Sequence, residues 1–288
     1  MPELPEVETI RQGLSRRVIR KRIKQVSVRK KKIVRGSATA FEKVLRGNSF
    51  AQVGRHGKLL ILPLTKGDKV LLIHLKMTGQ LIYRQKKDVI AGGHQWPPVD
   101  PMELPNKYSH VIMDFTDGSQ LFFNDLRQFG FMELADQKRL HVVLDHMGID
   151  PIKEKLTLEK LQALFKKRST SIKAVLLNQQ LIAGIGNIYA DEICFMAHVK
   201  PTRPVQSLSL KELKSIQSSI SRVLERAISY GGTTFRNYLN TEGGKGNYTE
   251  KLFVYGRGGK ICKRCKKGTI TKIRLAGRGT HFCPACQY

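Results

Sequence analysis

Four of the five cysteines of the chain lie near its C-terminal end, in two Cys-x-x-Cys pairs. Cys262 and Cys265 form the first pair and Cys283 and Cys286 form the second, with residues 266–282 between them. Thiolates at this spacing are typical of a structural, tetrahedral zinc site. Because four thiolates complete the coordination shell, the pattern predicts one structural zinc ion that takes no part in catalysis.

Two further residues that could be taken for zinc ligands, Cys194 and His281, need a separate interpretation. Cys194 stands apart from the cluster and is expected to be a buried core thiol. His281 lies close to the second pair, but the four cysteines already fill a zinc shell. We therefore expect His281 at the surface or facing a nucleic acid.

The first residues of the chain, MPELPEVE, also carry groups that could do chemistry. Loss of Met1 would leave Pro2 with a free secondary amine, which is a good nucleophile. Glu3 and Glu6 follow within one helical turn and could supply or accept protons. The ordinary alternatives are that Pro2 only starts a helix and that these acids, with Glu8, only compensate its dipole.

The composition indicates a folded protein with a polyanionic partner. The chain has 288 residues, with 51 Lys and Arg against 23 acidic residues, and a formal net charge of +28. Such a charge favours nucleic acid as the partner, and 41% hydrophobic residues argue against a disordered tail. No apolar run is long enough to span a bilayer, so no membrane partner is expected. The acidic start lacks a secretory pattern, so a cytoplasmic location is expected.

Three segments that could position these groups differ in their periodicity. Residues 2–17 have the apolar spacing of a helix, whereas short β-rich runs over 22–135 indicate a sandwich or barrel. Residues 157–250 return to helical spacing, with Thr157 and the Ser209–Glu212 pair as helix starts. We therefore expect domains at 1–145, 157–250 and 251–288, with a linker at 146–156 and a long inserted loop at 86–107.

Six motifs along the chain together resemble one known family, the bacterial formamidopyrimidine-DNA glycosylases, also called 8-oxoguanine DNA glycosylases. This resemblance implies an α+β fold: an N-terminal helix with an antiparallel β-sandwich, a helix-two-turn-helix lobe and a β-hairpin zinc finger. No organic cofactor is implied. The motifs are MPELPEVE (1–8), HLKMTG (74–79), NDLRQFG (124–130), AGIGNIYADE (183–192), LFVYGR (252–257) and GRGTHFCPACQ (277–287).

The resemblance also implies an activity and its catalytic groups. The Pro2 amine would attack C1′ of the damaged nucleotide and form an iminium that allows β,δ-elimination, so the enzyme would be both glycosylase and abasic-site lyase. Glu3 would supply the proton, with support from Glu6. Lys58 matches a lysine on a β-turn near the damaged base, and Arg278 matches a zinc-finger arginine at the phosphates beside the lesion.

Three residues match those that fill the gap left by the extruded base. Met77 and Arg127 would replace the lost stacking, Arg127 would also read the orphaned cytosine, and Phe129 would wedge the opposite stack. Core packing is the ordinary alternative for Met77 and Phe129.

Four more residues match DNA contacts of the family. Asn187 would offer its amide to a phosphate next to a helix start, although the glycines before it could simply end a helix. His74 and Lys173 fit further phosphate and lesion contacts. Tyr248 takes the aromatic position of the lesion-capping loop, where segment 243–249 departs from the usual Gly-x-Phe pattern and leaves base preference open.

The expected partner is duplex DNA that contains oxidised bases or abasic sites, bound by a monomer in the bacterial cytoplasm at the nucleoid. Two alternatives stay open at this point. One is an endonuclease VIII-like enzyme for oxidised pyrimidines, although the start PELPEVE favours the purine branch. The other is a zinc-containing protein that binds DNA without catalysis.

Overall fold

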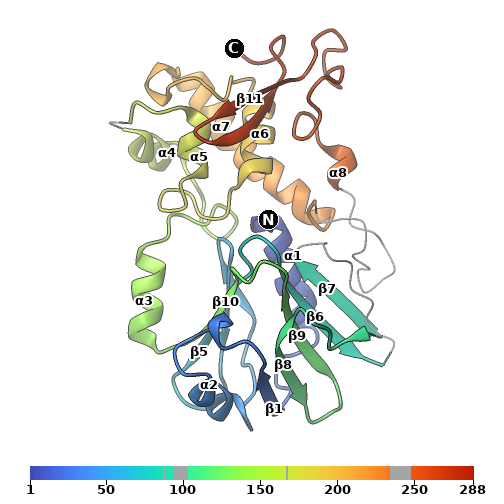
Figure 1. The fold of residues 1–288 in the computed structure, drawn as a ribbon. Coiled ribbons are helices and arrows are strands. Elements are labelled where there is room, and N and C mark those ends of the chain that lie inside the picture. The colour runs from blue at the N-terminus through green and yellow to red at the C-terminus, as the bar shows by residue number, and fades with distance from the viewer. Residues whose placement is uncertain (87, 94–102, 167, 234–247) are drawn as a thin grey trace. The chain divides into compact units, whose positions relative to one another are not determined.

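The computed structural model describes residues 1–86, 88–93, 103–166, 168–233 and 248–288. These form two compact units (Figure 1). The first unit contains Met1–Asp145 and Tyr230–Thr249, and the second contains His146–Ser229 and Glu250–Tyr288. Of the described residues, 230–233 and 248–249 thus group with the first unit.

The first unit begins with helix α1 (Leu4–Ser15), which confirms the helix predicted over residues 2–17. Leu4, Val7, Ile10 and Leu14 recur every three or four residues and are all buried, as an amphipathic helix requires. The helix contacts strands of both sheets described below. It therefore presents its first turn from a fixed position on the sandwich.

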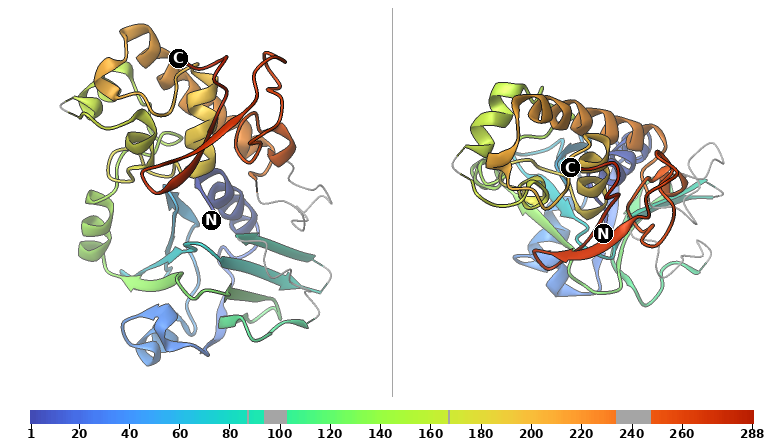
Figure 2. Two further views of the ribbon diagram at one scale, coloured as in Figure 1. Left: turned by 45° about the horizontal axis from the view of Figure 1, so that its top comes forward. Right: turned by 90° about the horizontal axis from the view of Figure 1, so that it is seen from above.

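Two five-stranded sheets form the main part of this unit within the described residues, as predicted for a sandwich (Figure 2). All strand pairs run antiparallel except β2 with β10. The first sheet has the order β1 (Ile23–Val28), β8 (Ser109–Phe115), β9 (Gln120–Asp125), β6 (Gly79–Gln85) and β7 (Asp88–Gly93). The second has the order β2 (Val34–Arg35), β10 (Phe131–Ala135), β5 (Val70–His74), β4 (Leu59–Pro63) and β3 (Gly54–His56).

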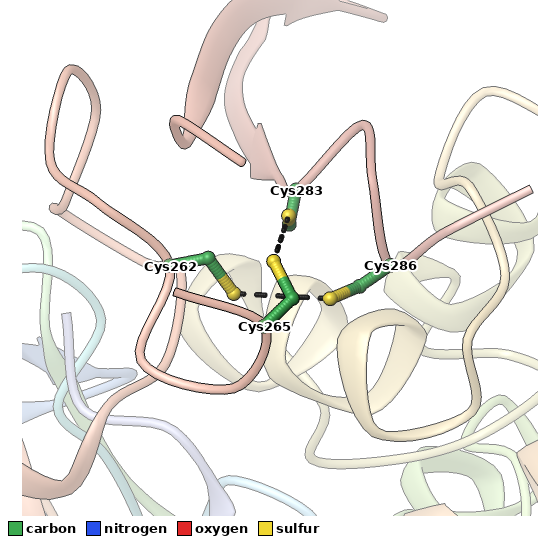
Figure 3. Close-up of side chains that lie close together, drawn as sticks. All are labelled: Cys262, Cys265, Cys283 and Cys286. Carbon is green, nitrogen blue, oxygen red and sulfur yellow. Dashed lines mark hydrogen bonds between the residues drawn. The ribbon is translucent and has the colours of Figure 1, made fainter. Parts of the chain in front are cut away.

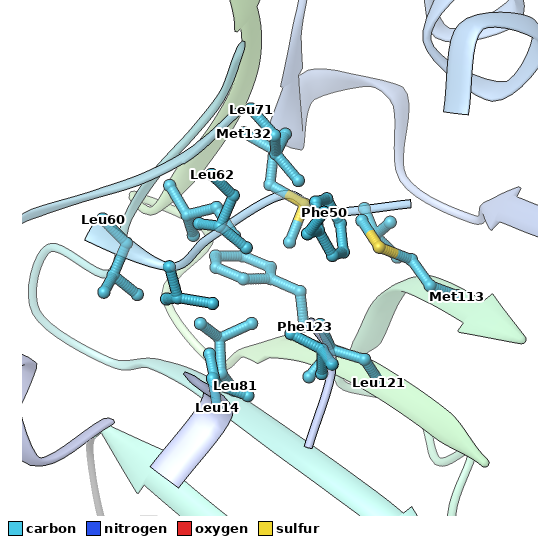
Figure 4. Packing of buried hydrophobic residues seen from close by; sticks show 14 of the residues in the cluster. Leu14, Phe50, Leu60, Leu62, Leu71, Leu81, Met113, Leu121, Phe123 and Met132 are labelled. Atoms are coloured by element: carbon cyan, nitrogen blue, oxygen red, sulfur yellow. The ribbon is translucent and has the colours of Figure 1, made fainter. Parts of the chain in front are cut away.

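Side chains from the two sheets and α1 form one hydrophobic core (Figure 4). Alternate residues of β4, β5, β6, β8 and β9 belong to it, which follows from the two-residue period of a β-strand. Its members include Leu14, Phe50, Leu60, Leu62, Leu71, Leu81, Met113, Leu121, Phe123 and Met132.

Helical elements also lie beside the sheets, and none of them was predicted from the sequence. Helix α2 (Ala38–Leu45) starts at Ser37, whose side chain accepts a hydrogen bond from the Ala40 N–H, and it buries Phe41 and Leu45. The 3-10 helix η1 (Lys31–Ile33) precedes α2. Helix α3 (Gln137–Asp145) ends the segment Met1–Asp145 of this unit. These elements are short, and the β-rich sequence around them hid their helical periodicity.

The second unit is mainly helical, as predicted. Its elements are α4 (Leu158–Phe165), α5 (Ile172–Leu177), α6 (Asn187–Met196), η3 (Val205–Ser207) and α7 (Leu210–Ser229). Thr157 caps α4, and Ser209 and Glu212 form the predicted capping box at α7. In the described part of the chain, no helix is long and apolar enough to cross a membrane.

The C-terminal segment folds on α6 through a β-hairpin. After α8 (Tyr248–Lys251), strands β11 (Thr271–Leu275) and β12 (Arg278–Phe282) pair antiparallel, and β12 contacts α6. Ala276 and Gly277 connect the strands with φ values of +48° and +74°. Two positive φ values fit the type I′ turn that favours such hairpins, and Gly277 adopts its value at little cost.

Candidate active site and zinc centre

The structure brings Pro2, Glu3 and Glu6 together at the start of α1. Glu3 is the N-cap residue, and its N–H donates to Glu6 Oε2 at 2.8 Å. The two glutamates form a capping box, which satisfies N–H groups that a helix start leaves without partners. All three residues are buried, so Pro2 stands next to two enclosed carboxylates.

The second oxygen of Glu6 binds another part of the same unit. Glu6 Oε1 accepts hydrogen bonds from the Thr233 N–H at 2.6 Å and the Thr233 hydroxyl at 3.0 Å. Gly232 precedes it with a φ of +82°, and a Cβ there would lie 2.6 Å from Glu6 Oε1. Since both its oxygens are engaged, Glu6 is suited to hold the helix start in place.

Glu8 has a partner that the sequence did not reveal. Arg55 is fully buried and lies 3.0 Å from Glu8 Oε2, and Arg11 lies 2.7 Å from Glu8 Oε1. Burial acts to raise the pKa of Glu8, but hydrogen bonds from Arg11, Arg55 and Gln12 outweigh it and lower the pKa. Glu8 is thus an ionised structural anchor of α1.

A cationic cluster surrounds His74 at the end of β5. Lys58 lies in the turn between β3 and β4, as the resemblance implied, and is buried. Burial, together with Lys76, Lys58 and Arg35, lowers the pKa of His74 to about 3. His74 Nδ1 accepts a hydrogen bond from the Lys76 N–H at 3.0 Å, so the neutral ring carries its proton on Nε2. The cluster therefore combines positive charge with a neutral imidazole donor.

Met77, Arg127 and Phe129 lie together on loops of the first unit. Met77 is in the turn between β5 and β6, and the other two follow β9. Arg127 Nη1 lies 3.1 Å from Met77 Sδ, and its guanidinium carbon lies 4.6 Å from the Phe129 ring centroid. Met77 is 39% exposed and Phe129 is 53% exposed, so neither is core.

A buried carboxylate holds these two loops together. Asp125 Oδ1 accepts hydrogen bonds from the Thr78 hydroxyl and, at 3.2 Å, from the Arg127 N–H, and Oδ2 accepts from the Gly130 N–H at 2.7 Å. The Arg127 N–H also donates to Thr78 Oγ1 at 2.9 Å. Sequence reasoning missed Asp125, whose signal was an acidic residue at the end of an apolar strand.

In the second unit, Arg278 is exposed and Lys173 is not. Arg278 opens β12 directly after the turn of the hairpin. Lys173 is only 1% exposed, and its ammonium lies 2.6 Å from Asp191 and donates to Gly279 O and Thr280 Oγ1. The structure thus gives the Lys173 ammonium protein partners, whereas the resemblance implied a contact with a phosphate or the lesion.

Asn187 is the first residue of α6, and its Nδ2 donates to Gly279 O at 3.0 Å.

The expectation that His281 lies at the surface or faces a nucleic acid is wrong. This residue is 7% exposed, and its N–H and ring Nδ1 lie 2.8 Å and 3.2 Å from Asp191 Oδ2. Cys194 is fully buried, as predicted.

Tyr248 is buried, and its ring centroid lies 6.1 Å from that of Tyr230. Residues 243–247 of the predicted lesion-capping loop lie outside the described residues. So do residues 87 and 94–102 of the predicted insertion. The aromatic side chain of Tyr248 is therefore placed, but the loop it was assigned to is not.

The four C-terminal cysteines converge as the sequence predicted (Figure 3). Their sulfur atoms all lie within 4.8 Å of one another, and the Cys262–Cys286 and Cys265–Cys283 pairs are each 3.8 Å apart. A tetrahedral zinc with Zn–S bonds of about 2.3 Å separates its sulfurs by about 3.8 Å. Hydrogen bonds from Gly268 and Lys267 lower the pKa of Cys265 to about 6, whereas burial raises the pKa of Cys283 and of Cys286. This donor set fits a structural zinc ion.

Family models match the chain along most of its length. The formamidopyrimidine-DNA glycosylase N-terminal domain matches residues 1–132, and the H2TH domain of the same enzymes matches 147–238. The zinc finger found in FPG and IleRS matches 259–287.

Individual relatives agree with these matches. The formamidopyrimidine-DNA glycosylase of Desulfitobacterium hafniense is 38% identical over 290 residues, which is 100% of both chains. That of an Exiguobacterium strain is 39% identical over 291 residues, covering 100% of this chain and 99% of the relative. The Lactococcus lactis enzyme in complex with abasic-site DNA has a TM-score of 0.86 at 32% identity, and the match covers 99% of each chain.

The fold and the site define a two-unit α+β protein of the zinc-finger DNA glycosylase class, as expected from the sequence. The chain belongs to the formamidopyrimidine-DNA glycosylase family. The predicted fold and the predicted zinc cofactor are confirmed.

Replacing Cys262 with serine should remove the zinc ion, since an oxygen ligand completes the thiolate shell poorly. DNA binding should then be lost while the first unit stays folded, because the metal organises only the C-terminal segment. Metal analysis, DNA binding and circular dichroism would measure this. Cys194→Ala is the matched control and should keep one zinc ion per chain. Unchanged DNA binding by zinc-free Cys262→Ser would contradict the structural role of the metal.

His74 should make the protein less stable as the pH falls. Its pKa is about 3 in the folded chain and about 6.5 when unfolded, so the unfolded chain takes up the proton first. The contribution of the neutral His74 ring to the free energy of unfolding is present above pH 6.5 and is lost as the pH falls towards 3. Urea unfolding at pH 7 and pH 5 should therefore show a smaller pH effect in His74→Gln than in the wild type. An equal effect in both proteins would refute this assignment.

Proposed function

We propose that this chain removes oxidised purines, including 8-oxoguanine and formamidopyrimidines, from duplex DNA and then cuts the strand through the amine of Pro2. Membership of the family supports the glycosylase and lyase activities. The observation that carries the role of Pro2 is its position beside the buried Glu3–Glu6 capping box. That box fixes the backbone on which the amine stands.

The chemistry needs Pro2 to be unblocked and neutral. Its nitrogen lone pair attacks C1′ of the damaged nucleotide, the glycosidic bond breaks, and the base leaves with the bonding electrons and a proton. A secondary amine bonded to an opened sugar gives an iminium cation. This cation withdraws electrons as the C2′ proton is removed and the 3′ phosphate departs, and a second elimination releases the 5′ phosphate.

The two buried glutamates, Glu3 and Glu6, have different roles. Glu6 has both oxygens occupied by Glu3 and Thr233, so it positions the helix start. Glu3 immediately follows the nucleophile in the chain and supplies the proton that opens the sugar or accompanies the leaving base. Lys58, in the β3–β4 turn, provides positive charge near the reacting nucleotide.

Extruding a base costs a few kcal/mol of lost stacking and pairing, and the exposed loop residues offset this cost. Met77 and Arg127 enter the vacated space, and Phe129 wedges the opposite stack. Their exposure supports this role, because large apolar side chains at a surface gain from contact with base faces. Asp125 pre-organises the loops, so little ordering is needed on binding.

The phosphates flanking the lesion meet cationic and amide groups. In the second unit, the Arg278 guanidinium and the Asn187 amide bind these phosphates. In the first unit, the neutral His74 ring donates its Nε2–H to a phosphate. We place this activity on chromosomal DNA in the bacterial cytoplasm and expect the protein to act as a monomer.

Replacing Pro2 with alanine should strongly reduce cleavage of a duplex that carries 8-oxoguanine opposite cytosine, because the reactive secondary amine is lost. Pro5→Ala is the matched control in the same first turn and should retain activity. Gel assays of strand cleavage would measure both variants. A duplex with an oxidised pyrimidine tests the rival specificity in the same assay. Faster cleavage of that duplex by the wild type, or full activity of Pro2→Ala, would overturn the proposal.

Replacing Phe129 with alanine should slow base excision by ~10-fold or more, since a stacking contact contributes ~1–3 kcal/mol. The free energy of unfolding should change by less than about 0.5 kcal/mol, because the side chain is exposed. Single-turnover excision and urea unfolding would measure the two effects. Val142→Ala, an exposed apolar residue of α3, should change neither. A stability loss that matched the loss of activity would indicate a packing role for Phe129.

A further inference from the structure

Helix α6 carries two adjacent carboxylates that are buried in an otherwise apolar helix. Asp191 is fully buried and Glu192 is 2% exposed. Acidic side chains are almost never buried this deeply unless they have partners. Their backbone partners lie in the C-terminal segment, and Asp191 also pairs with Lys173 of α5.

Glu192 holds the chain before the zinc-binding cysteines. Its Oε1 accepts hydrogen bonds from the N–H groups of Val254 and Tyr255 at 2.8 Å and 2.9 Å. Oε2 accepts from the Phe253 N–H at 2.9 Å. One carboxylate thus binds three successive backbone N–H groups and fixes the start of the segment.

Asp191 holds the final strand. Its Oδ1 lies 2.6 Å from the Lys173 ammonium, and its Oδ2 accepts a hydrogen bond from the His281 N–H at 2.8 Å. The His281 ring also lies 3.2 Å from Oδ2 and packs edge-on against Tyr255. A side chain of α6 therefore bonds directly to the backbone of β12.

Lys173 extends this contact towards the turn of the hairpin. Its ammonium donates to Gly279 O at 3.0 Å and to Thr280 Oγ1 at 2.8 Å. The Thr280 hydroxyl donates in turn to Arg278 O at 3.2 Å. An unbroken series of polar contacts therefore connects Asp191 with the backbone of Arg278.

We infer that Asp191 is a positioning residue for Arg278, acting through Lys173 and His281 to fix β12 on α6. This inference rests on the proposed role of Arg278 at the DNA phosphates. A two-stranded hairpin is marginally stable alone, and the cysteines hold only the end of β12 that lies away from Arg278. The Asp191 contacts, together with the Asn187 amide on Gly279 O, secure the strand up to the turn, so they contribute to where the exposed guanidinium stands. Lys173 is then a part of this support.

The test is a double-mutant cycle on Asp191 and Arg278. Asp191→Asn keeps the side-chain shape but removes the charge that holds Lys173. Affinity would be measured for a duplex with a stable abasic-site analogue, together with the zinc content of each protein. Glu225→Gln, an exposed acid on α7, is the control and should bind like the wild type.

Arg278→Ala and Asp191→Asn should each weaken binding by ~10-fold or more, with zinc retained. The double variant should bind no more weakly than Arg278→Ala alone, because Asp191 acts through the lost guanidinium. Additive losses would overturn the inference. So would unchanged binding by Asp191→Asn while Arg278→Ala is weakened, and then the role of Arg278 would stand. Unchanged binding by Arg278→Ala would overturn both.

If Asp191→Asn loses its zinc ion, the double-mutant cycle is repeated with a milder variant, His281→Gln, in place of Asp191→Asn. His281→Gln removes the ring contact with Asp191 and leaves the backbone N–H in place. A weaker affinity that is not additive with Arg278→Ala supports the inference. An additive loss, or no loss at all, overturns it.

Discussion

Both oxygens of the Glu6 carboxylate are engaged, one by the Glu3 N–H and the other by Thr233. The N-cap residue is thereby fixed, and Pro2 is attached directly to it. A nucleophile on a chain end would otherwise sample many orientations, and chemistry needs its lone pair held towards C1′. The burial of α1 against both sheets stabilises this arrangement, and Gly232 leaves room for it.

Buried carboxylates do comparable structural work elsewhere in the molecule. Asp125 joins the two loops that carry Met77, Arg127 and Phe129, and Asp191 with Glu192 attaches the zinc-binding segment to α6. In a chain with a net charge of +28, these buried acids lie where backbone N–H groups or a buried cation need a partner. Exposed basic residues such as Arg127 and Arg278 remain available for phosphates.

Local signals in the sequence predicted much of this structure. The helix starts at Thr157 and Ser209, the zinc cysteines and the β-hairpin each depend on neighbours within a few residues or on metal spacing. The burial of Lys173 and His281 could not be predicted from local sequence. Both side chains are held by Asp191, which is distant in the chain from His281. The exposure of Phe129 likewise follows from tertiary packing, since an apolar residue between strands can face either side.

The central claim is that the Pro2 nitrogen forms the covalent bond to DNA. Borohydride reduction of the reacting complex, followed by protease digestion and peptide mass spectrometry, would locate that bond directly. The account predicts a sugar remnant on the nitrogen of a peptide that begins at Pro2 and lacks Met1. A remnant on a lysine such as Lys58, or an active protein that retains Met1, would contradict it.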